Sequence, residues 1–295
     1  MAFVPPSNDE IRQVLTGVQQ LTPVGDGGFK VVYKATLSNG VDEALKLILL
    51  PPDPDESASL SSRVEREVRV LKNCSERALV KLASIELQSI KIGSRDFLAY
   101  SEEYLLADDL KKIISERRRL SGNPPLEQEL KHLARTLAVA VKEIANQKCI
   151  HRDIKPGNVM KLTDPSRPFV LLDLGLAFDT EDSPITANPN AIPGTPIYFS
   201  PEMLGPNFRN SIDYRSDLYA VGTTIYEYAT GAHPLHALGN SISQTYHRIL
   251  KVRPSPLQTL RPDLSSTFCV LIDKMLRKRP ALRPNLDEVI ALTSE

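Results

Sequence analysis

The amino-acid sequence predicts an α+β fold of two lobes, a small five-stranded antiparallel lobe followed by a larger helical lobe. Two observations support this prediction: strand-like segments and turn signals dominate residues 18–104, and apolar residues at helical spacing dominate residues 105–295. The chain has 295 residues, which suits two lobes because a domain usually holds about 100–200 residues. A cleft between the lobes is the expected place for a binding site.

The small lobe is predicted to contain five strands and one helix, preceded by an N-terminal extension over residues 1–17 with a short capped helix. Turn signals such as Asn39-Gly40 separate strand-like runs, which predicts three antiparallel strands within residues 18–50. The remaining elements expected in this lobe are a helix over residues 60–72 and strands over residues 79–87 and 97–105.

The larger lobe is predicted to be mainly helical. Its strongest signal is an amphipathic helix over residues 126–147, in which Leu130, Leu133 and Leu137 lie on one stripe. The other expected elements are a helix over residues 109–118, short strands over 159–162 and 169–172, and helices over 217–230, 241–250, 264–276 and 286–292.

The composition is that of a globular protein with a sizeable core. Hydrophobic residues make up 41% and charged residues 24% of the chain, near the usual averages of about 45–50% and about 25%. The 36 basic and 36 acidic residues cancel, so the charge gives no general attraction to nucleic acid or to an anionic membrane. We therefore expect neither of these as a partner.

The cysteines and the lack of a long apolar run predict a cytoplasmic location. Cys74, Cys149 and Cys269 lie far apart and form no CxxC pair, which fits neither a disulfide framework nor a zinc site. Residues 1–10 lack the basic and apolar regions of a signal peptide. No segment approaches the roughly 18 uninterrupted apolar residues of a membrane span.

A glycine-rich turn and a lysine on a strand form the first candidate site. Gly25, Gly27 and Gly28 lie between two predicted strands, where glycines let backbone N–H groups approach a phosphate chain closely. Lys46 lies on the third strand, and Glu67 on the following helix is its expected partner. This signal is weak by itself, because a glycine-rich hairpin is more often simply a turn.

A polar loop supplies a second and more specific site. Residues 151–158 read His-Arg-Asp-Ile-Lys-Pro-Gly-Asn, and residues 172–175 read Leu-Asp-Leu-Gly. If the two short strands beside this loop fold back on each other, Asp153, Asn158 and Asp173 share one small volume. One carboxylate can then accept a hydroxyl proton while the other two acceptors hold a divalent ion, which is the division of labour that phosphoryl transfer requires.

These residues resemble those of the eukaryotic-type (Hanks-type) serine/threonine protein kinases, over about residues 18–292. The resemblance implies a bilobal protein-kinase-like domain over residues 18–295, with its lobes meeting near residues 104–105. It also implies ATP-dependent transfer of the γ-phosphate to Ser/Thr hydroxyls of a protein substrate, with ATP and Mg²⁺ as cofactors. Lys155 is the form seen in serine/threonine kinases rather than tyrosine kinases.

The resemblance assigns a role to each matching residue. Asp153 would be the catalytic base and Lys155 would contact the γ-phosphate. Lys46 would bind the phosphates, with Glu67 as its partner on the helix. The expected metal ligands are Asn158 and Asp173, and the expected nucleotide-binding residues are Gly25, Gly27, Phe29, Val32, Ala44, Lys46, Glu103, Leu105 and Met160.

The chain departs from the family's pattern at three positions. Lys30 stands where the third glycine of the loop usually lies, and Leu174 replaces the commoner phenylalanine. At the gatekeeper position, which is the strand residue at the back of the nucleotide pocket, Glu102 aligns best. A one-residue slip of the strand would place Ser101 there instead, and the sequence leaves both alternatives open.

The match continues with residues 194–202, which read Gly-Thr-Pro-Ile-Tyr-Phe-Ser-Pro-Glu and resemble the end of an activation segment. Within them Thr195 would form a hydrogen bond near the catalytic base, and Glu202 would pair with Arg283. Arg152, which precedes the base, is in many kinases the partner of a phosphate on this segment. The expected autophosphorylation sites are Thr180, Ser183 and Thr186.

An active kinase is predicted over two alternatives. An inactive kinase fold that serves as a scaffold generally lacks the lysine, the base or a metal position, and all of them are present here. A kinase that acts on a small molecule is disfavoured by the intact residues 194–202, which dock a peptide in protein kinases. The oligomeric state is left open by the sequence.

Overall fold

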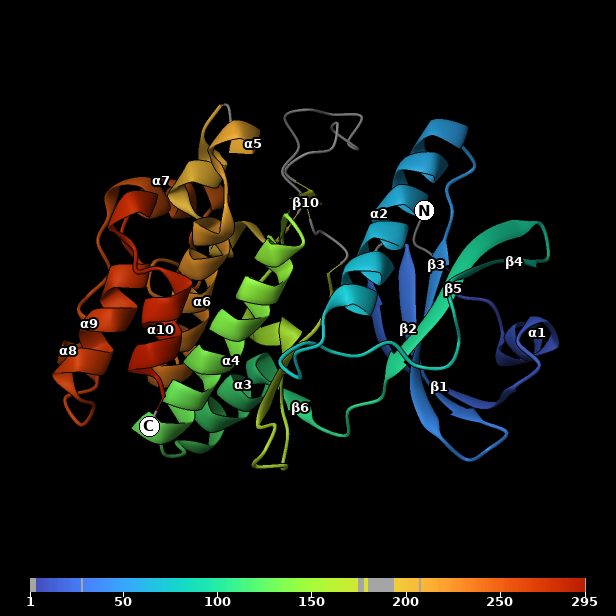
Figure 1. The fold of residues 1–295 in the computed structure, drawn as a ribbon, viewed down its shortest axis with the longest axis horizontal. Coiled ribbons are helices and arrows are strands. Elements are labelled where there is room, and N and C mark those ends of the chain that lie inside the picture. The colour runs from blue at the N-terminus through green and yellow to red at the C-terminus, as the bar shows by residue number, and fades with distance from the viewer. Residues whose placement is uncertain (1–3, 28, 175–177, 180–193, 207, 295) are drawn as a thin grey trace. The chain divides into compact units, whose positions relative to one another are not determined.

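A computed structural model describes residues 4–27, 29–174, 178–179, 194–206 and 208–294 of the chain (Figure 1). These residues divide into two compact units. The first unit contains the described part of residues 1–73 and residues 80–106, and the second contains residues 74–79 and the described part of residues 107–295. No helix among the described residues is both long and apolar enough to cross a membrane.

The first unit contains the predicted five-stranded antiparallel sheet. Its strands, in the spatial order β1-β2-β3-β5-β4, are β1 (Val18–Gly27), β2 (Lys30–Leu37), β3 (Asp42–Leu49), β4 (Gln88–Ile92) and β5 (Arg95–Glu103). Buried and half-buried residues alternate along β2, because successive side chains of a strand point to opposite faces. The buried residues Val31, Tyr33 and Ala35 join apolar residues of β3 and β5 in one core.

Two helices pack on this sheet. Helix α1 (Asn8–Val14) begins at Ser7, which forms a capping box with Glu10, and Ile11 of α1 belongs to the core of the sheet. The helix predicted within residues 1–17 is therefore part of the first unit. Helix α2 (Pro54–Asn73) packs Val64 against Tyr100 and other apolar residues of β3 and β5.

The strand predicted over residues 79–87 is wrong, since the regular strand of this region is β4, further along the chain. Residues 81–85 do run beside β5, with backbone hydrogen bonds from Glu103 to Lys81 (2.8 Å) and from Ala83 to Ser101 (2.9 Å). Other backbone N–H groups of the segment donate to side chains instead: the Lys81 N–H donates to the Glu103 carboxylate and the Ser84 N–H donates to the Glu43 carboxylate. These side-chain bonds replace part of the strand ladder.

The second unit is mostly helical, as predicted. Its helices are α3 (Leu110–Leu120), α4 (Glu127–Asn146), α5 (Phe208–Ser211), α6 (Tyr214–Thr230), α7 (Ile242–Lys251), α8 (Leu257–Leu260), α9 (Ser266–Met275) and α10 (Leu286–Leu292). Five begin at a side chain that caps the first turn, namely Asp109, Asp213, Ser241, Ser265 and Asn285. Helix α4 packs against α6 and α10 (Figure 1), and its predicted apolar stripe is fully buried.

Short strands of the second unit carry the polar loop. A three-stranded sheet has the order β6-β8-β9, formed by β6 (Asp108–Asp109), β8 (Val159–Lys161) and β9 (Phe169–Leu171). Strand β7 (Cys149–Ile150) pairs with β10 (Phe178–Asp179). The hairpin of β8 and β9 pairs Val159 with Leu171, so the residues just before β8 and just after β9 lie next to each other.

Candidate active site

Lys46 on β3 is held by two carboxylates in the first unit. Its Nζ lies 2.9 Å from Oε1 of Glu67 on α2 and 2.6 Å from Oε1 of Glu102 on β5. All three side chains are buried, with exposed fractions of 5%, 3% and 4%. The structure thus forms the expected pair of Lys46 and Glu67. It adds Glu102 as a second carboxylate, which sequence reasoning did not assign to the lysine.

The register of β3 and β5 decides between the two gatekeeper alternatives. Ala44 pairs with Glu102, and Lys46 pairs with Tyr100, so these four residues share one face of the sheet. Ser101 points to the other face, where its hydroxyl donates to Glu43 at 2.6 Å. Glu102 therefore occupies the position beside Lys46.

Most of the other predicted nucleotide-binding residues lie in the same unit. Val32 pairs with Lys46 across β2 and β3, so Val32 and Ala44 lie on the face of Lys46, where both are half-buried. A Cβ atom added at Gly25 would meet nothing within 4 Å, so packing within the unit does not require glycine there. The space beside the Gly25 backbone is therefore free for a ligand to approach. The remaining predicted residues of this unit are Gly27 at the end of β1, Phe29, which is exposed, and Glu103 and Leu105, which are half-buried.

Asp153 receives hydrogen bonds on both carboxylate oxygens in the second unit. Oδ2 accepts from Lys155 Nζ at 2.6 Å and from Asn158 Nδ2 at 3.1 Å. Oδ1 accepts from Thr195, through the backbone N–H at 3.0 Å and through the hydroxyl at 2.8 Å. Lys155 also donates to the Thr195 hydroxyl at 2.6 Å. The four donors fix the orientation of the carboxylate, and Thr195 lies where the resemblance places it.

Buried Asp217 on α6 holds the loop that carries Asp153. Its two carboxylate oxygens accept the backbone N–H groups of His151 and Arg152, each at 2.8 Å, and burial raises the pKa of Asp217 above its ordinary value. Arg152 and Asp173 have φ angles of 67° and 62°, a left-handed region that non-glycine residues seldom adopt and that is over-represented at functional sites. Sequence reasoning missed this role of Asp217; the available signal was an aspartate directly before the apolar run over residues 218–221 in the first turn of α6.

The predicted metal ligands offer oxygen atoms of the kind that Mg²⁺ prefers. The Asn158 amide donates to the Asp153 backbone oxygen at 2.8 Å and to its carboxylate, which leaves the amide oxygen of Asn158 for a ligand. The Leu172 N–H donates to the Asn158 backbone oxygen at 2.8 Å, so Asp173, the next residue after Leu172 and beyond the end of β9, follows this contact directly. Among the described residues no three His, Cys, Asp or Glu side chains cluster to hold a metal. Mg²⁺ needs no such cluster, because one or two carboxylates and substrate phosphates usually hold it.

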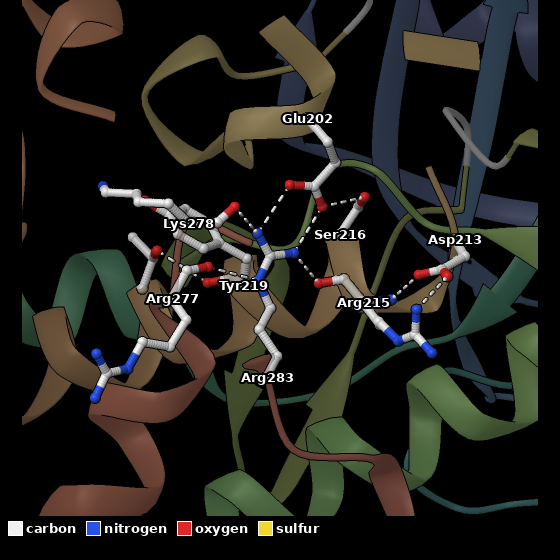
Figure 2. A network of polar contacts seen from close by, with 9 residues as sticks. Glu202, Asp213, Arg215, Ser216, Tyr219, Arg277, Lys278 and Arg283 are labelled. Carbon is white, nitrogen blue, oxygen red and sulfur yellow. Dashed lines mark hydrogen bonds and ion pairs between the residues drawn. The ribbon is translucent and has the colours of Figure 1, made fainter. Parts of the chain in front are cut away.

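A buried ion pair anchors the end of residues 194–202, as predicted. Arg283 donates to both carboxylate oxygens of Glu202, at 2.6 and 2.8 Å, and Ser216 donates to the same carboxylate (Figure 2). Arg283 also donates to the backbone oxygens of Arg215 and Arg277. Burial would raise the pKa of Glu202, but the bonds from Arg283 outweigh it and hold that pKa below its ordinary value.

The middle of the same segment is tied to α6. The Tyr198 hydroxyl donates to Glu227 at 2.7 Å, and the Tyr198 ring meets the edge of His233 with 5.2 Å between centroids. Burial raises the pKa of Glu227 and lowers that of His233 to about 3, so His233 is neutral at physiological pH. The candidate phosphorylation sites Thr180, Ser183 and Thr186, in contrast, lie outside the described residues.

The comparisons with known proteins agree with this geometry. Residues 18–293 match the protein kinase domain family. A probable serine/threonine-protein kinase of Clostridium perfringens is 28% identical over 261 residues, which cover 88% of this chain and 35% of the relative. A serine/threonine-protein kinase of Myxococcus xanthus is 29% identical over 268 residues, which cover 88% of this chain and 46% of the relative.

One similar protein is named as lacking activity. An inactive serine/threonine-protein kinase of Mus musculus is 28% identical over 268 residues, which cover 90% of this chain and 41% of the relative. The chain spans less than half the length of these three curated relatives. With nearly all of its residues matched, the chain belongs to the protein kinase domain family.

Proposed function

We propose that the chain is an active serine/threonine protein kinase that transfers the γ-phosphate of ATP to hydroxyl groups of a protein. The observation that carries this proposal is the environment of Asp153, whose carboxylate is held on both oxygens by Lys155, Asn158 and Thr195. Catalysis of phosphoryl transfer is mostly positioning and charge stabilisation. A buried carboxylate with a lysine 2.6 Å away supplies both.

The second unit provides the groups for the transfer step. Asp153 accepts the proton of the attacking hydroxyl while the hydroxyl oxygen bonds to the γ-phosphorus and the bond from that phosphorus to the oxygen of ADP breaks. Lys155 stabilises the negative charge on the transferred group. Asn158 and Asp173 would hold Mg²⁺, which neutralises phosphate charge when it is bound. Met160 on β8, half-buried, is proposed to contact the adenine.

The first unit provides groups for binding the nucleotide. Lys46 binds phosphate oxygens, and the backbone around Gly25 and Gly27 approaches the phosphate chain. Val32 and Ala44 contact the adenine ring. This assignment is supported by their common face on β2 and β3. Phe29 is proposed to contact the nucleotide as part of the glycine-rich loop, and Glu103 and Leu105 are proposed as further nucleotide-binding residues.

An inactive scaffold is the second candidate, because one similar protein is named as inactive. The lysine, the base and both metal positions are present in this chain, which favours the active enzyme.

The test is to incubate the purified protein with Mg-ATP and a generic basic protein and to map phosphosites by mass spectrometry. We expect phosphoserine and phosphothreonine, and Asp173→Asn should weaken Mg-dependent ATP binding. Nucleotide binding without any phosphate transfer would support the scaffold.

We also propose a cytoplasmic location, with a protein substrate and no nucleic-acid or membrane partner. The zero formal net charge and the separated cysteines support this. The test is fractionation of cells that express the protein. Recovery of the chain with membranes or outside the cell would contradict the proposed cytoplasmic location.

A further inference from the structure

Three buried side chains of the first unit form a cluster with an excess of negative charge. Lys46 contributes one ammonium, and Glu67 and Glu102 contribute two carboxylates at 2.9 and 2.6 Å from it. The ring centroid of Tyr100 lies 5.2 Å from Lys46 Nζ. Burial, and next the charge of Glu67, raise the pKa of Tyr100 well above its ordinary value, so the phenol is neutral. The groups in direct contact here are thus two carboxylates and one ammonium.

The two carboxylates reach Lys46 from different elements. Glu67 comes from α2, whereas Glu102 comes from β5, which is hydrogen-bonded to the strand of Lys46 itself. A carboxylate on the neighbouring strand is fixed by the register of the sheet and does not depend on where α2 lies. Lys46 thus has a second tether built into the sheet, and this tether is also the shorter of the two contacts.

We infer that Glu102 is a positioning residue that holds Lys46 within the sheet and makes the phosphate-binding lysine discriminate against nucleotides that carry no divalent cation. The inference rests on the proposed nucleotide-binding role of Lys46. Two carboxylates more than neutralise the lysine, so a triphosphate that approaches it meets less attraction than a single Lys–Glu pair would provide. The penalty grows with the charge of the phosphates. It is greatest for ATP alone, smaller for its Mg²⁺ complex and negligible for adenosine.

Glu43 offers a matched control on the opposite face of the same sheet. It is as well buried as Glu102, with exposed fractions of 4% and 3%. Its partners, however, are the neutral Ser101 hydroxyl and the Ser84 N–H. Glu43→Gln therefore removes a buried carboxylate from the sheet without touching Lys46, whereas Glu102→Gln keeps the size of the side chain and removes the charge beside the lysine.

The tether is tested first without any nucleotide, by thermal unfolding. Lys46→Met leaves two buried carboxylates without their cation, and loss of one partner from a buried ion pair is strongly destabilising. Adding Glu102→Gln to Lys46→Met should therefore raise the melting temperature, whereas adding Glu43→Gln should not. If the melting temperature of the Lys46→Met, Glu102→Gln protein is equal to or lower than that of Lys46→Met, the inference that Glu102 holds Lys46 is overturned.

The discrimination is tested by calorimetric titration of the wild type, Glu102→Gln and Glu43→Gln with ATP plus EDTA, ATP plus Mg²⁺, and adenosine. We expect Glu102→Gln to bind metal-free ATP about tenfold more tightly than the wild type, to gain less for Mg-ATP and to bind adenosine unchanged. Glu43→Gln should change the affinity for none of the three ligands in this way. An equal change for all three ligands, or weaker ATP binding, would overturn the discrimination.

These measurements keep this inference separate from the proposed enzyme activity. Both read binding or unfolding, so a protein that binds ATP but transfers no phosphate would overturn only the proposed kinase activity. A wild type and a Glu102→Gln protein that bind no ATP in any form would overturn the discrimination together with nucleotide binding. In that case the melting temperatures still decide whether Glu102 holds Lys46.

Discussion

Single residues of the candidate site meet partners that are distant in the sequence. Arg283 contacts Glu202 across 81 residues, and Lys46 contacts Glu102 across 56 residues. The first contact could be predicted, because the family resemblance names both residues. The second could not, because a strand taken alone does not reveal which of its faces meets Lys46, and a one-residue slip would have presented Ser101 instead.

Replacing Arg283 tests the ion pair that ends the 194–202 segment. Its side chain is fully buried and that of Glu202 is 8% exposed, so Arg283→Ala leaves a buried carboxylate without its cation. We expect the free energy of unfolding to fall by about 3–5 kcal/mol, measured by urea denaturation. Activity should fall as well, because Glu202 lies in the same segment as Thr195.

The matched control for Arg283 is Arg215, an exposed neighbour in Figure 2 whose side chain pairs with Asp213 at 3.3 Å and is 39% exposed. Exposed pairs contribute at most about 1 kcal/mol, so Arg215→Ala should lose far less stability than Arg283→Ala. Similar losses in the two variants would show that Arg283 is not held as a buried partner of Glu202.

Lys278 gives a prediction with a defined pH dependence. Burial, and next the charge of Arg283, lower its pKa from 10.5 to about 8. Between about pH 8 and pH 10.5 the folded state therefore binds fewer protons than the unfolded state. Over this range the contribution of Lys278 to the free energy of unfolding rises with pH. Lys278→Met should unfold at a higher temperature than the wild type at pH 7, and the difference should shrink between pH 8 and pH 10.5. A difference that stays constant over this range would show that packing, not charge, is responsible.

At the scale of helices and strands, the sequence predicted the elements with strong periodicity. The helix over residues 126–147 and the hairpin over residues 159–172 are confirmed by α4, β8 and β9. The prediction of a strand over residues 79–87 is wrong because the side chains of Glu43 and Glu103 accept hydrogen bonds from backbone N–H groups of this segment. A pattern of apolar residues carries no information on such long-range side-chain bonds. The one-turn helices α5 and α8 are too short to show a period.

The packing of α6 on α9 depends on the absence of a side chain at Gly222. A Cβ atom at this position would lie 2.7 Å from Cβ of Met275. Alanine is favoured over glycine inside a helix by about 1 kcal/mol, yet overpacking a core costs about 1–3 kcal/mol. We expect Gly222→Ala to lower the free energy of unfolding by about 1 kcal/mol, measured by chemical denaturation. A more stable Gly222→Ala protein would show that the helices separate without cost.

At the scale of the whole molecule, the sequence resemblance and the family match cover almost the same residues. The resemblance assigned Asp153, Asn158 and Thr195 to one place, and the structure joins them by direct hydrogen bonds. The supports of the site were harder to predict. Asp217 acts on the loop through backbone N–H groups, and any sequence of the loop would offer those groups, so the loop residues give no signal for this contact.

The rate of phosphate transfer by Asp153→Asn tests the central claim most directly. Asparagine keeps the size of the side chain but cannot accept the hydroxyl proton as a carboxylate does, and a general base usually contributes about 10²–10⁴-fold to a rate. The measurement is the initial rate of phosphate transfer from Mg-ATP to a basic protein, with Asp287→Asn, whose side chain is 77% exposed, as the matched control. We predict a loss of at least about 100-fold for Asp153→Asn in a protein that is still folded at the assay temperature, and a wild-type rate for Asp287→Asn. A wild-type rate in Asp153→Asn would contradict the account.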